Sequence, residues 1–203
     1  MIDLTRKLVH GFPTWPGDTP FAFQPTMQIQ HGDTVNVGMF STTTHLGTHL
    51  DAPYHYSDQG LKLGEIPLTT LIGECLVIDA RGHRLLPVTL LEGIGQLPER
   101  VAFFTGEPEE WSTFPTDFSA FSPELIDHLG HHGVKMLITD APSVDPLTSK
   151  DLPAHQACLR NNIVILEGVN LNGVEFKKYE LICLPLNLVD ADGAPARAIL
   201  REL

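Results

Sequence analysis

The sequence is short of basic residues and of cysteine, and both shortages narrow what the protein can be. Lys and Arg number 13 against 25 Asp and Glu, which gives a formal net charge of −12 at pH 7. Because such a chain repels polyanions, we expect no nucleic-acid partner and no binding to an anionic membrane surface. The three cysteines, Cys75, Cys158 and Cys183, are widely separated. Their spacing argues against a disulfide framework and against a thiolate zinc site, and it favours a reducing, cytoplasmic location.

Long apolar runs and low-complexity segments are also missing. No stretch approaches the roughly 20 apolar residues that a membrane span needs. The first seven residues lack the apolar core of a signal peptide. No repeat and no linker is visible, and the composition is 42% hydrophobic and 19% charged. A chain of 203 residues with this composition predicts one well-buried domain that spans residues 1–203.

Turn-forming residues are abundant: 16 prolines and 17 glycines are spread along the whole chain. This spread predicts many short elements joined by tight turns. A helix is expected at 123–131, with Ser122 as its N-cap and Pro123 at its first position. A second helix is expected from Thr148 to Arg160, and residues 89–96 give a weaker helical pattern. Strands are expected at residues 2–5, 21–29, 35–41, 74–79, 101–105, 135–139, 163–166, 179–184 and 197–201. The predicted fold is therefore a strand-rich α/β domain with a few helices.

One short segment concentrates metal-binding residue types. Residues 44–55 place His45, His49, Asp51 and His55 at odd-numbered positions, so an extended chain would carry all four on one face. Imidazole nitrogen and carboxylate oxygen are the usual ligands of a hydrolytic zinc or manganese ion. The segment predicts a metal site with a spare histidine beside it. The alternative is a solvated polar loop without an ion.

The spacing also predicts how this segment bends. A fully extended strand would hold the Cα atoms of His45 and His49 roughly 13 Å apart. That distance is near the limit for two imidazoles that share one ion at about 2.0–2.1 Å each. Gly47 can turn the chain without steric cost, so we expect a turn there. A short extended piece should follow and present His49 and Asp51 on one side.

Several polar residues outside this segment are further candidates. Asp140 and Glu167 each follow a buried strand, where functional groups tend to gather. A turn-starting Asp and a solvent-exposed strand end are their alternative readings. His155 lies on the second predicted helix and could face the core or a site. Trp15 stands in a proline-framed turn, as a core anchor or as a flat surface for an aromatic ligand.

Taken together, these segments resemble the bacterial kynurenine formamidases (arylformamidases) of the cyclase-like metal hydrolase family. The opening motif reads His45-x-Gly47-Thr48-His49-x-Asp51-Ala52-Pro53-x-His55. Further matching pieces are Trp15-Pro16-Gly17-Asp18-Thr19-Pro20, Asp140-x-Pro142-Ser143-x-Asp145-Pro146, His155, Ile165-Leu166-Glu167-Gly168 and Asp192-Gly193-x-Pro195-x-Arg197. The resemblance runs nearly end to end. It implies the cyclase-family fold, of the swivelling β/β/α type, and a homodimer.

The resemblance also implies a site and an activity. Two divalent metal ions per chain are expected, with zinc as the first expectation and manganese as the alternative. The implied ligands are His45, His49 and Asp51 for the first ion, with Asp51, His155 and Glu167 reaching the second and Glu167 touching both. His55 would carry protons and Trp15 would contact the substrate. The implied reaction is hydrolysis of the aryl formamide of N-formyl-L-kynurenine to L-kynurenine and formate in tryptophan degradation.

Two rival functions stay open at this point. One is hydrolysis of another small aryl or cyclic amide such as isatin. Many family members have an arginine where this chain has Phe104, so the resemblance is weaker on the substrate than on the metal chemistry. The other rival is a metal- or ligand-binding protein without turnover. The spare His55 favours an enzyme, because binding alone does not need it.

Overall fold

The computed structural model describes residues 1–203, and its centre is a mixed sheet that closes on itself. The strands are β1 (Ile2–Asp3), β4 (His49–Asp51), β5 (Ile72–Asp79), β7 (Arg100–Phe104), β9 (Met136–Thr139), β10 (Val164–Glu167), β11 (Lys178–Pro185) and β12 (Gly193–Arg201). Their order is β1-β12-β11-β5-β7-β9-β10-β4, and β4 also pairs with β12. The strands from β12 to β4 therefore form a closed barrel, and β1 pairs with β12 outside the ring. The predicted strand-rich α/β fold is confirmed.

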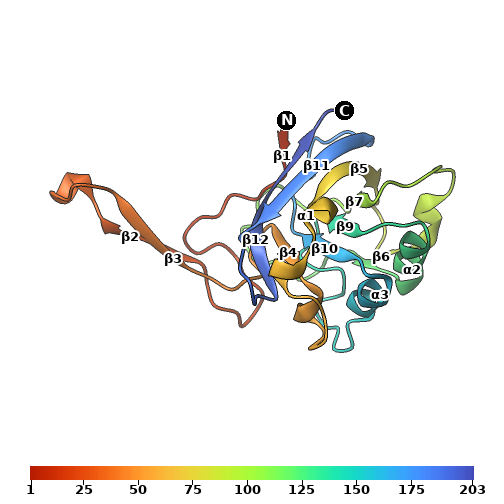
Figure 1. Cartoon of the computed structure of the whole chain (residues 1–203), viewed down its shortest axis with the longest axis horizontal. Coiled ribbons are helices and arrows are strands. Elements are labelled where there is room, and N and C mark those ends of the chain that lie inside the picture. The colour runs from red at the N-terminus through yellow and green to blue at the C-terminus, as the bar shows by residue number, and fades with distance from the viewer.

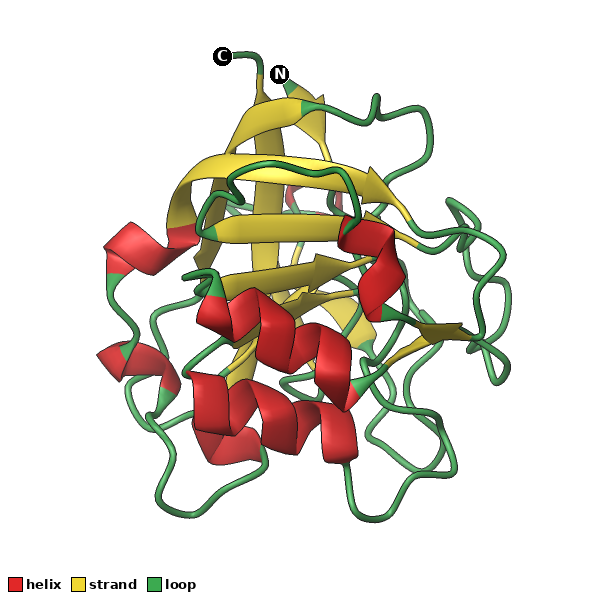
Figure 2. Cartoon of the chain, turned by 90° about the vertical axis from the view of Figure 1, so that its right-hand side faces the viewer, coloured by secondary structure: helices red, strands yellow, loops and turns green.

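Two apolar cores lie on opposite faces of this sheet. Strands β5, β7, β9 and β10 run parallel, and their side chains alternate between the two cores. In β9, Met136 and Ile138 belong to the larger cluster with Leu50 and Leu166. Leu137 belongs to the second cluster, beneath α2 (Pro123–His131) and α3 (Pro153–Asn161). Figure 2 shows these two helices side by side over one face of the strands.

The helices agree with the sequence in part. Ser122 accepts a hydrogen bond from the Leu125 N–H and caps α2 as predicted. The expected start of α3 at Thr148 is wrong: the helix begins at Pro153, because Leu152 has a left-handed backbone (φ 45°) that no helix continues through. The weak helix at 89–96 is reduced to a 3₁₀ turn, η4 (Val88–Leu91). None of the helices is long and apolar enough to span a membrane.

All nine predicted strands are present, with ends shifted by a few residues. Short elements escaped the sequence patterns because a few residues show no periodicity. They are β6 (Leu85–Leu86), β8 (Ala120–Phe121), α1 (Leu68–Leu71) and the 3₁₀ turns η1 (Ile29–His31), η2 (Pro53–His55) and η3 (Leu63–Glu65). The short extended piece predicted after Gly47 is present as β4.

A two-stranded arm stands apart from the barrel. Strands β2 (Ala22–Met27) and β3 (Val37–Ser41) pair only with each other, and the ribbon projects far to one side of the body (Figure 1). Large apolar side chains on the arm are exposed: Phe23, Met27, Ile29, Val35, Val37, Met39 and Phe40. An isolated ribbon of this kind is marginally stable in water.

Candidate active site

Strand β4 places two of the predicted ligands on the outer face of the barrel. Leu50 points into the larger core, so its neighbours His49 and Asp51 point to the opposite face. The antiparallel register sets His49 against Glu167 at the end of β10. Glu167 is buried, so its reading as a solvent-exposed strand end is wrong. Strand pairing thus joins a local motif to a carboxylate more than 100 residues away.

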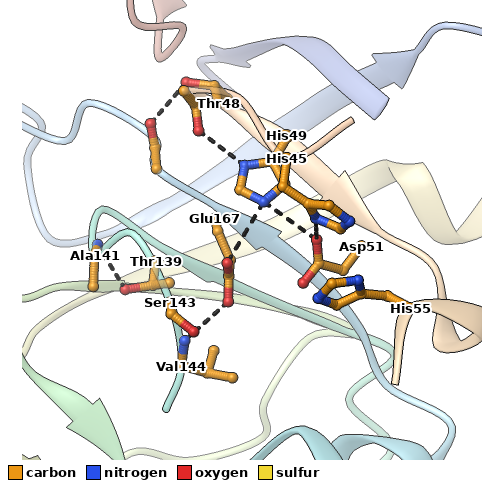
Figure 3. Close-up of polar contacts among 12 residues, drawn as sticks. His45, Thr48, His49, Asp51, His55, Thr139, Ala141, Ser143, Val144 and Glu167 are labelled. Carbon is orange, nitrogen blue, oxygen red and sulfur yellow. Dashed lines mark hydrogen bonds and ion pairs between the residues drawn. The ribbon is translucent and has the colours of Figure 1, made fainter. Parts of the chain in front are cut away.

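The turn predicted at Gly47 is present, with a left-handed backbone (φ +57°). His49 Nδ1 lies 3.0 Å from the Gly47 carbonyl oxygen, and its Nε2 lies 3.3 Å from Asp51 Oδ1 and 3.6 Å from Glu167 Oε2 (Figure 3). On the N-terminal side of the turn, His45 Nδ1 comes within 2.8 Å of Asp51 Oδ1. The bend therefore gathers the two imidazoles around one carboxylate.

His155 faces this cluster from the first turn of α3. Its Nδ1 donates to Asp145 Oδ2 at 2.7 Å, and the Asp145 carboxylate also accepts the N–H groups of Ala154 and His155 at 3.0 Å each. His155 Nε2 is left 3.6 Å from Asp51 Oδ2 and 3.8 Å from Glu167 Oε1. Of the two orientations left open by the sequence, the structure has the one toward the site.

The charges at this cluster shift one another's pKa values. Burial disfavours the charged forms, but neighbouring carboxylates outweigh it and raise the pKa of His45 and of His155 to about 10. Asp51 is buried as well, yet the surrounding imidazoles hold its pKa well below the usual range. Burial and the Asp51 charge raise the pKa of Glu167 to about 7. Negative charge is thus concentrated where only imidazoles balance it.

The donor set suits a divalent cation. Two triads bring their ligand atoms within 4.8 Å of one another: His45, Asp51 and His55 form one, and His49, Asp51 and Glu167 form the other. Asp51 belongs to both triads. Its Oδ2 is buried without a hydrogen-bond partner, which is costly for a carboxylate unless a cation meets it. His55 lies close enough to be a ligand, although the family resemblance implies that it carries protons instead.

A cavity of about 310 Å³ opens above the cluster. His45, His49, His55, His155 and Glu167 line one part of it, and Trp15, Trp111 and Phe114 line another. The rings of Trp15 and Phe114 meet edge to face, with centroids 5.4 Å apart. Trp15 is half-buried and faces the cavity, so it offers a flat apolar surface beside the imidazoles.

Phe104, which stands where many family members have an arginine, lies away from this cavity. Its ring stacks on Phe176 at a centroid distance of 6.3 Å, and the Arg81 guanidinium lies over it at 5.2 Å. Phe104 does not line the cavity. Phe104 therefore forms no part of the wall of this cavity.

Three other acidic residues complete the picture. Asp140 is structural: its carboxylate accepts four hydrogen bonds, from Thr105 N and Oγ1 and from the N–H groups of Gly106 and Glu107.

Asp145 and Asp192 contact the histidines, but the sequence analysis gave neither of them a role. Asp192 Oδ2 lies 3.0 Å from His45 Nε2 and 3.6 Å from His55 Nδ1. Their only signal was their place in segments that matched the family.

Comparisons with known sequences identify the family of this chain. The cyclase family profile matches residues 2–146. A kynurenine formamidase of Erythrobacter litoralis is 43% identical over 211 residues, covering 99% of this chain and 93% of that protein. The chain belongs to the kynurenine formamidases of the cyclase family. A kynurenine formamidase of Geobacillus thermodenitrificans is 40% identical over 203 residues, covering 100% of this chain and 97% of that protein.

Solved structures of the cyclase family share the fold. A potential metal-dependent hydrolase with cyclase activity superposes with a TM-score of 0.83 at 24% identity, covering 98% of this chain and 95% of that chain. Isatin hydrolase A from Labrenzia aggregata gives 0.83 at 21% identity, covering 98% and 92%. The closed barrel with its covering helices is thus the architecture of the family.

Proposed function

We propose that the protein is a metal-dependent arylformamidase that hydrolyses N-formyl-L-kynurenine to L-kynurenine and formate. The observation that carries this proposal is the His/Asp/Glu cluster beside an aromatic-walled cavity. Its full-length relatives bear the name kynurenine formamidase. An aryl formamide presents an aromatic ring and a carbonyl to be attacked by water, which matches these two parts of the cavity.

Five residues would hold the metal in this proposal: His45, His49, Asp51, His155 and Glu167. We take zinc as the metal, with two ions per chain, because imidazole and carboxylate donors suit it and Asp51 belongs to both triads. Bound there, a pair of ions supplies positive charge that polarises the formyl carbonyl and lowers the pKa of water to about 7. His155 is oriented for this by Asp145, and His49 by the Gly47 carbonyl.

His55 is the proton carrier in this proposal. Its side chain is 33% exposed, against 16% for His45, 6% for His49 and 4% for His155, so it is the most solvent-accessible of the four imidazoles that line the cavity. The aniline nitrogen leaves poorly as an anion and needs a proton. His55 takes a proton from the attacking water and returns it to that nitrogen, a contribution typically worth about 10²–10⁴ in rate. Trp15 stacks on the aryl ring and sets its position.

We also propose that the whole chain acts as one domain within a cytoplasmic homodimer. The exposed arm supports association, because residues 22–41 contain one acidic residue and no Lys or Arg. In a chain of net charge −12, an apolar surface with a single charged residue is where two copies meet with little repulsion. The free, buried cysteines fit a reducing compartment. Light scattering at micromolar concentration tests the dimer, and a monomer mass would contradict it.

The deciding experiment measures hydrolysis of N-formyl-L-kynurenine by protein stripped with a chelator and then reloaded with zinc or manganese. We expect turnover that disappears on stripping and returns with metal. Isatin serves as the second substrate. Turnover of isatin but not of N-formyl-L-kynurenine would identify the protein as a cyclic-amide hydrolase. Absence of turnover of either substrate with metal bound would favour a binding protein.

A further inference from the structure

Asp192 is the one carboxylate that contacts both His45 and His55. Its Oδ2 lies 3.0 Å from His45 Nε2 and 3.6 Å from His55 Nδ1, and its Oδ1 accepts a hydrogen bond from Thr44 Oγ1 at 2.9 Å. We propose that Asp192 is a positioning residue that fixes the imidazoles of His45 for metal binding and of His55 for proton transfer. The His55 half of this inference rests on the proposed function, and the His45 half does not.

The backbone around Asp192 is built for this contact. Its carbonyl accepts the N–H of Ala52 at 2.9 Å, and the next residue, Gly193, pairs with Asp51 across β4 and β12. A Cβ at Gly193 would lie 2.7 Å from the Leu50 carbonyl oxygen and 3.0 Å from His45 Cε1. Only glycine permits this close approach, so the strand that closes the barrel also delivers the Asp192 carboxylate to the cluster.

The contact with Asp192 supports the His45 tautomer that metal binding through Nδ1 would need. The Nδ1 edge of the ring faces Asp51, and the Nε2 edge faces Asp192. An Nε2–H donated to Asp192 leaves the Nδ1 lone pair directed at the side where Asp51 offers its carboxylate. Carboxylates that hold a metal-binding histidine in this way typically change metal affinity about 10–100-fold when they are removed.

The same carboxylate restrains His55. The rings of His45 and His55 lie 3.8 Å apart, and Asp192 is the only acidic side chain within ion-pair distance of His55. Attraction of Nδ1–H to Asp192 leaves the other ring nitrogen of His55 free to exchange a proton with the substrate. A base that is oriented by a third group is an arrangement typical of enzyme active sites.

The test uses Asp192→Asn with Asp190→Asn as its matched control. Asp190 lies two positions away in the same loop, 80% exposed, and pairs with Lys62 at the surface. A competing chromophoric chelator gives the Kd for zinc. We expect it to rise about 10–100-fold in Asp192→Asn and to stay unchanged in Asp190→Asn. Thr44→Val removes the hydroxyl that holds Oδ1 and should shift the Kd the same way, even if Asp192→Asn fails to fold.

A double-mutant cycle tests whether Asp192 positions His55 for proton transfer. At saturating zinc, Asp192→Asn should lower kcat on N-formyl-L-kynurenine at least about 10-fold in the His55 background but less than about 2-fold after His55→Ala, because two residues that act as a unit are not additive. Equal losses in both backgrounds would overturn this half. An unchanged zinc Kd in both Asp192→Asn and Thr44→Val would overturn the His45 half. Wild-type protein that binds zinc but leaves N-formyl-L-kynurenine intact would refute the proposed function, while the Kd still decides on His45.

Discussion

Replacing His55 with alanine separates an enzyme from a metal-binding protein. The imidazole ends η2 at the cavity edge, one-third exposed, and its only ion-pair contact is with Asp192 at 3.6 Å. Its removal opens no buried void and breaks no short hydrogen bond. We therefore expect the free energy of unfolding to change by no more than about 0.5–1 kcal/mol.

The expected effect on catalysis is much larger. Loss of a positioned proton carrier lowers turnover about 10²–10⁴-fold. At about 1.36 kcal/mol per factor of ten, this corresponds to roughly 2.7–5.5 kcal/mol in the activation free energy. Substrate binding should change little, because proton transfer matters in the transition state and not in the ground state. The signature is a low kcat with an almost unchanged KM.

Metal content must be measured on the same samples that are assayed. His83→Ala is the control, since His83 is exposed and outside the cavity. Wild-type kcat in His55→Ala would refute the proton role. Loss of bound metal in proportion to activity would also refute the proton role, because it would show that His55 is a metal ligand together with His45 and Asp51.

Three further outcomes follow from the structure. Trp15→Ala should raise KM for an aryl formamide with metal content unchanged, as steady-state kinetics and elemental analysis can show. Gly168→Ala should destabilise the fold by about 2–4 kcal/mol in urea unfolding, because a Cβ would lie 2.2 Å from the Gly47 carbonyl oxygen at a φ of +65°; wild-type stability would contradict this. Burial and the nearby Asp140 raise the pKa of Glu107 from 4.5 to about 7, so folding loses stability as the pH rises through that window. Glu107→Gln should remove that loss, and a constant stability difference from wild type between pH 4 and 8 would contradict it.

Features that depend on neighbouring residues were predictable from the sequence. The nine predicted strands, the Ser122 cap and the turn at Gly47 each follow from periodicity or from the conformational preference of a single residue. The start of α3 was missed: Pro153 at the first helical position is the same signal that located α2, whereas the left-handed backbone at Leu152 carries no signal in a leucine side chain. Local patterns thus outlined the elements but missed an unusual residue.

Assembly of the site depends on strand pairing that no local pattern contains. Residue types and spacing singled out His45, His49, Asp51 and His55, whereas only the family resemblance singled out His155 and Glu167. The β4–β10 register explains why Glu167 belongs with His49. Asp192 joins them through the β4–β12 register, and a single sequence does not reveal this pairing.

The strand that closes the barrel also sets the order in which the protein can mature. Strand β4 is made early in synthesis, yet its partners are residues 165–167 and 193–195. A nascent chain that has reached residue 185 already contains all five proposed ligands but lacks the strand that shuts the ring and delivers Asp192. The complete cluster, with Asp192 beside His45 and His55, can therefore form only after β12 has been synthesised.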